Sequence, residues 1–199
     1  KAEKPVYLFV QDGKAELKDA RHLWGMKALE CQTAIRQELG DPDIKVALIG
    51  PAGENLVRFA AVGNDLDAFA GRTGMGAVMG SKKLKAVAVR GHQRVGLARP
   101  DEVKELARWI RDNAPIRNKG MHDLGTARVV TLLNALGGLP VRNFQDGSIE
   151  GASNIGGEAM RDTILLKRRA CYACPVQCKR EVKVDEPYQV DPRYCGPEY

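Results

Sequence analysis

The chain has 199 residues, of which 44% are hydrophobic and 28% are charged. This composition argues against general disorder and allows one large domain or two small ones. No apolar run approaches the ~20 residues of a membrane-spanning helix, and no signal-peptide pattern follows the polar start Lys1–Lys4. The formal net charge is +6, with the basic residues scattered. Such a charge suits an ordinary solvated surface or attraction to an anionic ligand or acidic partner. We expect a cytoplasmic protein without a membrane span.

Residues 1–93 predict a mixed part rich in β-strands. A β-hairpin is expected over residues 5–18, because two β-rich runs flank the turn dipeptide Asp12-Gly13. Asp19 is a candidate cap for a helix whose apolar positions recur at helical spacing, and Gly40 is its candidate stop. Further strands are expected at residues 45–50, 56–62 and 85–91.

Residues 94–199 predict a mostly α-helical part. A loop rich in Gly, Asn and Ser is expected over residues 143–157. Apolar faces at helical spacing predict helices around residues 103–110, 129–136 and 158–167. The expected fold class is therefore α+β, with a mixed β-rich N-terminal part followed by a helical part, divided near residue 93.

A glycine-rich run extends from Gly71 to Lys82 and contains Gly74, Gly76 and Gly80 as further glycines. Glycine lets backbone N–H groups approach an anion, and Arg72 is suited to bidentate binding of a phosphate. The run matches neither a Walker A loop nor G-x-G-x-x-G. A phosphate-binding loop and a tight turn that packs a small helix on a sheet both remain open.

The cysteines divide into one isolated residue and one cluster. Cys31 lies on an apolar helical stripe and is expected to be a buried core thiol. Cys171, Cys174 and Cys178 form C-x2-C-x3-C, a spacing that suits one soft metal centre. The spacing favours a [4Fe–4S] cluster over zinc. Zinc ribbons use two C-x2-C pairs, whereas this sequence has one such pair and no second pair around Cys195. Three unrelated free thiols are the remaining alternative.

Five segments, in order along the chain, resemble the tungsten-containing aldehyde:ferredoxin oxidoreductases. Five matches in order are far more specific than any one alone. They are Ile49–Arg58 (IGPAGENLVR), Gly71–Ala86 (GRTGMGAVMGSKKLKA), Leu139–Phe144 (LPVRNF), Cys171–Cys178 and Gly196–Tyr199 (GPEY).

The resemblance implies an internal fragment of an enzyme about three times as long. Residues 1–93 would be the end of the pterin-binding N-terminal domain, and residues 94–199 the start of the helical iron–sulfur portion. Family members carry tungsten or molybdenum on two pterins, Mg²⁺ that bridges the pterin phosphates, and a nearby [4Fe–4S] cluster. They interconvert aldehydes and carboxylic acids and pass electrons through the cluster to ferredoxin. The fragment alone is expected to be inactive.

The resemblance also implies roles for single residues. Cys171, Cys174 and Cys178 would be three cluster ligands, with the fourth beyond Tyr199 rather than at Cys195. Arg72 and the Thr73 backbone would contact pterin phosphates and Mg²⁺, with Gly74 and Gly76 allowing close approach. Glu198 would be a carboxylate near the metal. The D-x-x-G-L pterin motifs of the family and its downstream histidine do not occur in this sequence.

Two other functions remain open at this point. Within the same class, the chain would be the active-site subunit of a tungsten-dependent complex that reduces benzoyl-CoA. In a different class, it would be a basic, zinc-stabilised nucleic-acid-binding module, although its aromatic content of only 6% and the lack of a basic stripe count against this. We expect a protein that binds no nucleic acid. Its expected partner is ferredoxin or a dedicated electron-transfer subunit, its substrate is a small aldehyde or carboxylic acid, and it forms an oligomer.

Overall fold

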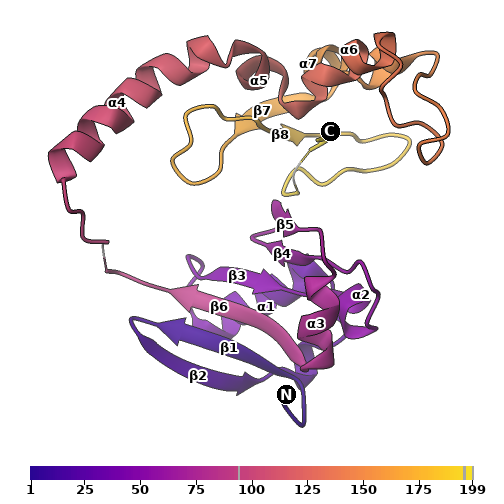
Figure 1. The fold of residues 1–199 in the computed structure, drawn as a ribbon. Coiled ribbons are helices and arrows are strands. Elements are labelled where there is room, and N and C mark those ends of the chain that lie inside the picture. The colour runs from indigo at the N-terminus through magenta and orange to yellow at the C-terminus, as the bar shows by residue number, and fades with distance from the viewer. Residues whose placement is uncertain (94, 195, 199) are drawn as a thin grey trace. The chain divides into compact units, whose positions relative to one another are not determined.

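The computed structural model describes residues 1–93, 95–194 and 196–198. Two compact units make up the chain: unit one, Lys1–Gly96, and unit two, Leu97–Tyr199 (Figure 1). Unit one holds a mixed sheet with helices, and unit two holds more helix than strand, so the expected α+β class is confirmed. Among the described residues, no helix combines the length and the apolar character needed to cross a membrane.

A six-stranded sheet forms the frame of unit one. Its strands are β1 (Val6–Gln11), β2 (Lys14–Asp19), β3 (Lys45–Leu48), β4 (Val62–Asn64), β5 (Ala68–Ala70) and β6 (Leu84–Arg90). They follow the order β2-β1-β6-β3-β4-β5, with β1 parallel to β6 and the other neighbours antiparallel. The predicted first hairpin is confirmed. Asp12 and Gly13 have φ values of 47° and 84°, which a tight hairpin turn of the I′ kind requires.

Helix α1 (Ala28–Leu39) packs on one face of this sheet. Its Cys31 and Ile35 are buried against Tyr7 of β1, Val46 of β3 and the alanines of β6. Burial raises the pKa of the Cys31 thiol to about 11. Cys31 is thus a core thiol, as its place on the apolar stripe predicts.

The helix starts later than the sequence predicts. Asp19 ends β2, and its carboxylate accepts the backbone N–H of Arg21 at 2.9 Å and binds the Arg21 side chain. A short 3₁₀ turn, η1 (Arg21–Leu23), follows, and the Glu30 side chain accepts the N–H of Lys27 at the true start of α1. The C-terminal end is as predicted, because Gly40 adopts the left-handed conformation with φ 71°.

The strand expected over residues 56–62 is wrong. The short helix α2 (Pro51–Glu54) comes just before it, and Leu56 has a left-handed φ of 58° that interrupts any extended run. Only β4 pairs with the sheet in this region. Helix α3 (Met75–Ser81) forms within the glycine-rich run and contacts α2.

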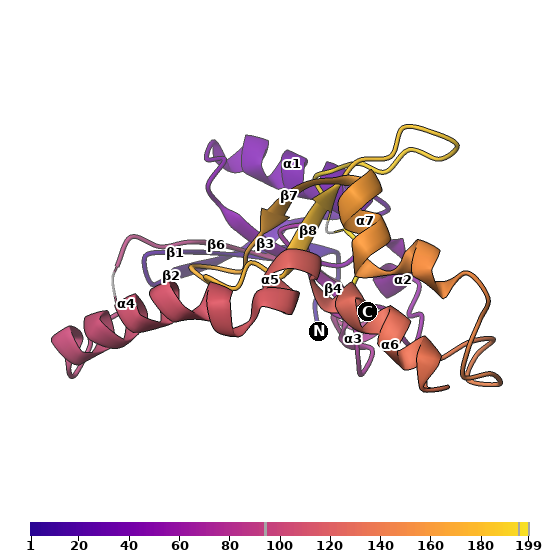
Figure 2. The ribbon, with the colours of Figure 1, turned by 90° about the horizontal axis from the view of Figure 1, so that it is seen from above.

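Unit two contains several helices and one two-stranded sheet, seen from a second direction in Figure 2. Its helices are α4 (Pro100–Arg117), α5 (Lys119–Leu124), η2 (Thr126–Val129), α6 (Val130–Ala135), η3 (Ala152–Ile155) and α7 (Gly157–Thr163). Its strands are β7 (Leu165–Arg169) and β8 (Lys179–Val182), which pair antiparallel. The core gathers Val130, Met160 and Val182 with neighbouring apolar residues.

This sheet corrects the helix expected over residues 158–167. The helix ends at Thr163, and the following residues pair with β8, which lies past the cysteine cluster in the sequence. The pairing is non-local, so the helical spacing of apolar residues before Cys171 gives no sign of it.

Candidate functional site

The glycines of the run Gly71–Lys82 allow α3 to lie directly against the backbone of residues 53–61. A Cβ on Gly80 would lie 1.9 Å from the Gly53 oxygen in α2, and one on Gly74 would lie 2.1 Å from the Arg58 oxygen. Gly76 donates its N–H to the Ala60 oxygen at 2.9 Å and is equally crowded. These contacts give Gly74 and Gly76 a role in packing α3. Their proposed approach to a pterin stays a prediction.

Arg72 and Thr73 lie on the exposed turn before α3. Thr73 has a left-handed φ of 67°, and its hydroxyl donates to the Arg72 oxygen at 2.6 Å. Within the described parts of the chain, the Arg72 guanidinium makes no hydrogen bond or ion pair. Its five donors are therefore available to an anion, which fits the phosphate contact expected from the sequence.

A buried ion pair fixes α2, against which the glycine-rich run packs. Lys85 of β6 is fully buried and binds the Glu54 carboxylate. Its ammonium also donates to the Met26 oxygen at 3.0 Å, and the other Glu54 oxygen accepts the N–H of Gly25 at 2.8 Å. The sequence motifs do not reveal this pair. Its signals in the sequence are a lysine within a largely apolar strand and, separately, a glutamate in the Ile49–Arg58 segment.

The cysteine cluster forms the loop that joins β7 to β8. Cys171 is exposed, Cys174 and Cys178 are half-buried, and the thiols are free. The Cys174 N–H donates to the Cys171 oxygen at 3.1 Å. Ala173 and Gln177, each just before a cysteine, have left-handed φ values of 54° and 52°. Such conformations cost energy in residues other than glycine, and they concentrate at ligand-binding segments.

Among the described residues, no three His, Cys, Asp or Glu side chains form a group arranged to hold a metal. The thiolate donor set nevertheless suits a soft metal centre. The cationic surroundings of the loop also suit an anionic cluster. Cross-strand pairs beside the loop place Arg168 opposite Arg180 and Arg169 opposite Lys179. The ligand role of the three cysteines stays a prediction.

The segment that holds Glu198 lies beside β8. Gly196 donates its N–H to the Arg180 oxygen at 2.7 Å, and a Cβ on Gly196 would lie 2.9 Å from that same oxygen. Glu198 is exposed. This segment and the cysteine loop thus belong to one region of unit two. Cys195 and Tyr199 lie outside the described residues.

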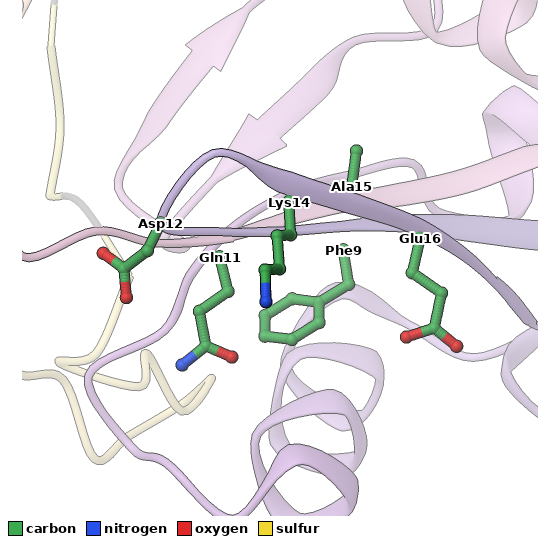
Figure 3. Close-up of a pocket in the computed structure, with 6 residues that line it drawn as sticks. All are labelled: Phe9, Gln11, Asp12, Lys14, Ala15 and Glu16. Carbon is green, nitrogen blue, oxygen red and sulfur yellow. The ribbon is translucent and has the colours of Figure 1, made fainter.

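Two of the surface hollows, one in each unit, are compared with the predicted site residues. One, of about 340 Å³, lies on the first hairpin of unit one and contains none of the predicted site residues (Figure 3). Its lining residues are Phe9, Gln11, Asp12, Lys14, Ala15 and Glu16. The other, of about 530 Å³, lies within unit two where α4 meets the cysteine loop, and it carries the cations Lys104, Arg108 and Arg111. The second hollow therefore lies next to a predicted site, the cysteine loop.

Two family sequence models match the chain in succession. The model described as aldehyde ferredoxin oxidoreductase, N-terminal domain, matches residues 1–91, and the one described as domains 2 and 3 of the same enzyme matches residues 101–199. The chain belongs to the aldehyde ferredoxin oxidoreductase family. The resemblance seen in the five sequence segments is thereby confirmed.

Individual relatives agree with the family assignment. The chain is 46% identical over 187 residues to the tungsten-containing aldehyde ferredoxin oxidoreductase of Thermococcus kodakarensis, covering 92% of this chain and 31% of that protein. It is 44% identical over 203 residues to the enzyme of the same name from Pyrococcus furiosus, covering 100% and 33%. The chain therefore spans about a third of the length of these relatives.

A solved structure supports the fold. The chain matches the active-site complex BamBC of benzoyl-coenzyme A reductase, determined with 1,5-dienoyl-CoA, with a TM-score of 0.70 and 29% identity. The match covers 95% of this chain and 31% of that one. The shared fold therefore extends over both units.

Proposed function

We propose that this chain is part of an oxidoreductase that interconverts aldehydes and carboxylic acids, with electrons leaving through a [4Fe–4S] cluster to ferredoxin. The observation that carries the proposal is the family match over both units, together with 44–46% identity to tungsten-containing relatives. The chain spans about a third of those relatives, so we expect it to be inactive by itself.

The residues of this chain have separate tasks in the proposal. When bound, the tungsten or molybdenum bis-pterin supplies two-electron chemistry, and the cluster supplies a one-electron outlet. Arg72 and the Thr73 backbone would bind pterin phosphates and their Mg²⁺ at the exposed turn before α3. Cys171, Cys174 and Cys178 would bind the cluster, and Glu198 would place a carboxylate near the metal.

The test is cluster loss in the full-length protein. Replacing Cys174 by Ser removes a soft thiolate, so we expect the iron and acid-labile sulfide to fall steeply and the broad visible absorbance to disappear. Cys195→Ser is the matched control, because this cysteine lies outside the motif, and its cluster should stay intact. An unchanged iron and sulfide content in Cys174→Ser would refute the ligand assignment.

A second function has one observation in its favour. The similarity to a benzoyl-coenzyme A reductase complex fits ring reduction on the same framework, but at 29% identity it is weaker than the match to the aldehyde enzymes. Assays with aldehydes and with aromatic acyl-CoA esters, using a viologen dye as the electron carrier, would separate the two. A zinc-stabilised nucleic-acid-binding module would instead contain zinc without iron or sulfide.

A further inference from the structure

Arg180 of β8 is a fully buried cation whose hydrogen bonds go to backbone carbonyls. One terminal nitrogen donates to the oxygens of Gln177 and Lys179 at 2.9 and 3.0 Å. The other donates to the oxygens of Met121 and His122, at the end of α5, at 3.1 and 2.9 Å. The guanidinium thereby joins α5 to the end of the cysteine loop.

The remaining donor of this guanidinium is unsatisfied. Nε is buried and has no hydrogen-bond partner. It faces Gly125, where an added Cβ would lie 3.3 Å from Nε and 2.8 Å from the Cys178 oxygen. The charge is therefore enclosed by backbone, and an unsatisfied buried donor adds to the cost of burying it.

None of the carboxylates in the described parts of the chain forms an ion pair with Arg180. Asp123 is a carboxylate whose charge acts on Arg180 without pairing with it, and it is already held by Lys119. Glu181 pairs with Lys167 and Arg169 instead, at 3.4 and 3.7 Å.

The residue opposite Arg180 on the neighbouring strand adds to the excess of positive charge. Arg168 lies directly opposite Arg180 in the register of β7 and β8, and like charges placed opposite each other destabilise a strand pair.

A buried, uncompensated cation costs several kcal/mol unless an anion accompanies it. The carbonyl dipoles at the end of α5 supply only part of the compensation. The anion that the sequence offers next to this position is the set of three thiolates whose last member, Cys178, lies two residues before Arg180. A [4Fe–4S] cluster held by thiolates carries a net negative charge, and nearby charge is one of the terms that set its potential.

We propose that the buried guanidinium of Arg180 is the fixed counter-charge of the cluster held by Cys171, Cys174 and Cys178, and that it raises the reduction potential of that cluster. The inference rests on the proposed function. Reduction adds one electron to the cluster, and the guanidinium stabilises the added negative charge. Arg180 touches no reacting atom of a substrate, so it is a positioning and electrostatic residue.

The experiment is a redox titration of the full-length, cofactor-loaded protein, followed by electron paramagnetic resonance of the reduced cluster. Arg180→Met removes the charge, and Arg180→Lys keeps it while losing the forked geometry. Arg168→Met is the matched control, because it removes an exposed charge from the opposite strand position. Iron and sulfide content are measured for every variant.

In Arg180→Met we expect the ratio of reduced to oxidised cluster at a fixed potential to fall about tenfold, equivalent to about 59 mV for a one-electron couple. Arg180→Lys should stay close to wild type, and the exposed control should shift the ratio by less than about twofold, since solvent and salt screen an exposed charge.

An unchanged ratio in iron-loaded Arg180→Met would overturn the inference and leave Arg180 a purely structural link. If Arg180→Met loses its iron while Arg180→Lys keeps it, the counter-charge role is supported. If both lose it alike, the hydrogen-bond geometry alone matters and the inference is wrong. Absence of iron from the wild-type protein would instead refute the proposed function, so the two failures are distinguishable.

Discussion

The two units differ in how they accommodate a fully buried cation. Unit one buries Lys85 completely and provides Glu54 as its partner, and it also buries its cysteine, Cys31, inside the core. Unit two buries Arg180 completely with no carboxylate partner among the described residues, and it places Cys171, Cys174 and Cys178 on a loop that is exposed or half-buried. Unit one thus pairs its buried lysine with its own glutamate. Among the described residues of unit two no carboxylate pairs with Arg180, and the cluster that we propose would supply the missing anion.

The largest expected effect concerns the buried ion pair of unit one. Glu54→Ala leaves Lys85 buried without its partner, so the free energy of unfolding of unit one should fall by about 3–5 kcal/mol. Urea denaturation followed by circular dichroism measures the change. Glu16→Ala breaks an exposed pair with Lys18 and is the control, with an expected change below about 1 kcal/mol. Equal effects of the two substitutions would contradict the importance of the buried pair.

A second test concerns Arg72, an exposed cation of unit one. Arg72→Ala should lower pterin and tungsten content together while the cluster survives, with the binding free energy weakened by about 1.5–3 kcal/mol, or roughly 10- to 150-fold in affinity. Arg72→Lys should recover only part of the content, since a point charge does not replace a bidentate fork. Arg21→Ala, an exposed arginine held by Asp19, should leave the content unchanged. Full pterin occupancy in Arg72→Ala would show that this arginine is not a cofactor contact.

A third test separates packing from ligand approach in the glycine-rich run. Gly80→Ala places a Cβ against the Gly53 backbone, where no flexible side chain can move aside, and should destabilise unit one by about 1–3 kcal/mol. Gly71→Ala meets nothing within 4 Å and should change stability by less than about 0.5 kcal/mol. Thermal unfolding of the two variants side by side gives the comparison. A stable Gly80→Ala protein would show that α2 and α3 are packed more loosely than the contact indicates.

The smallest effect concerns the buried thiol. Burial raises the Cys31 pKa from 9.0 to about 11, so its contribution to stability is complete below pH 9 and is lost as the pH rises through 11. Between pH 8 and pH 9.5 we expect a loss of a little under ~1 kcal/mol, because the unfolded chain releases the proton first. Cys31→Val should remove this part of the slope in urea titrations. An identical slope in the variant would mean that other groups cause it.

Local sequence signals predicted the elements that local interactions decide. The Asp12-Gly13 hairpin, the Gly40 helix end and β6 follow from turn chemistry, capping and β-propensity. One failure is non-local, because β7 (Leu165–Arg169) pairs with β8 across the cysteine loop. The other lies at a helix end, where Leu56 adopts a left-handed conformation just after α2.

The candidate site divides in the same way. The motifs made Arg72 and the cysteines candidates, because each motif is a short run of neighbouring residues in the sequence. They did not reveal Glu54, Lys85 or Arg180, whose importance depends on burial and on partners distant in the sequence.

Metal analysis of the full-length protein, purified without oxygen, determines whether the loop of Cys171, Cys174 and Cys178 holds an anionic iron–sulfur cluster beside the buried Arg180. We predict about four iron and four acid-labile sulfide per chain at this site, and their loss in Cys174→Ser. One zinc per chain, with neither iron nor sulfide, would contradict it.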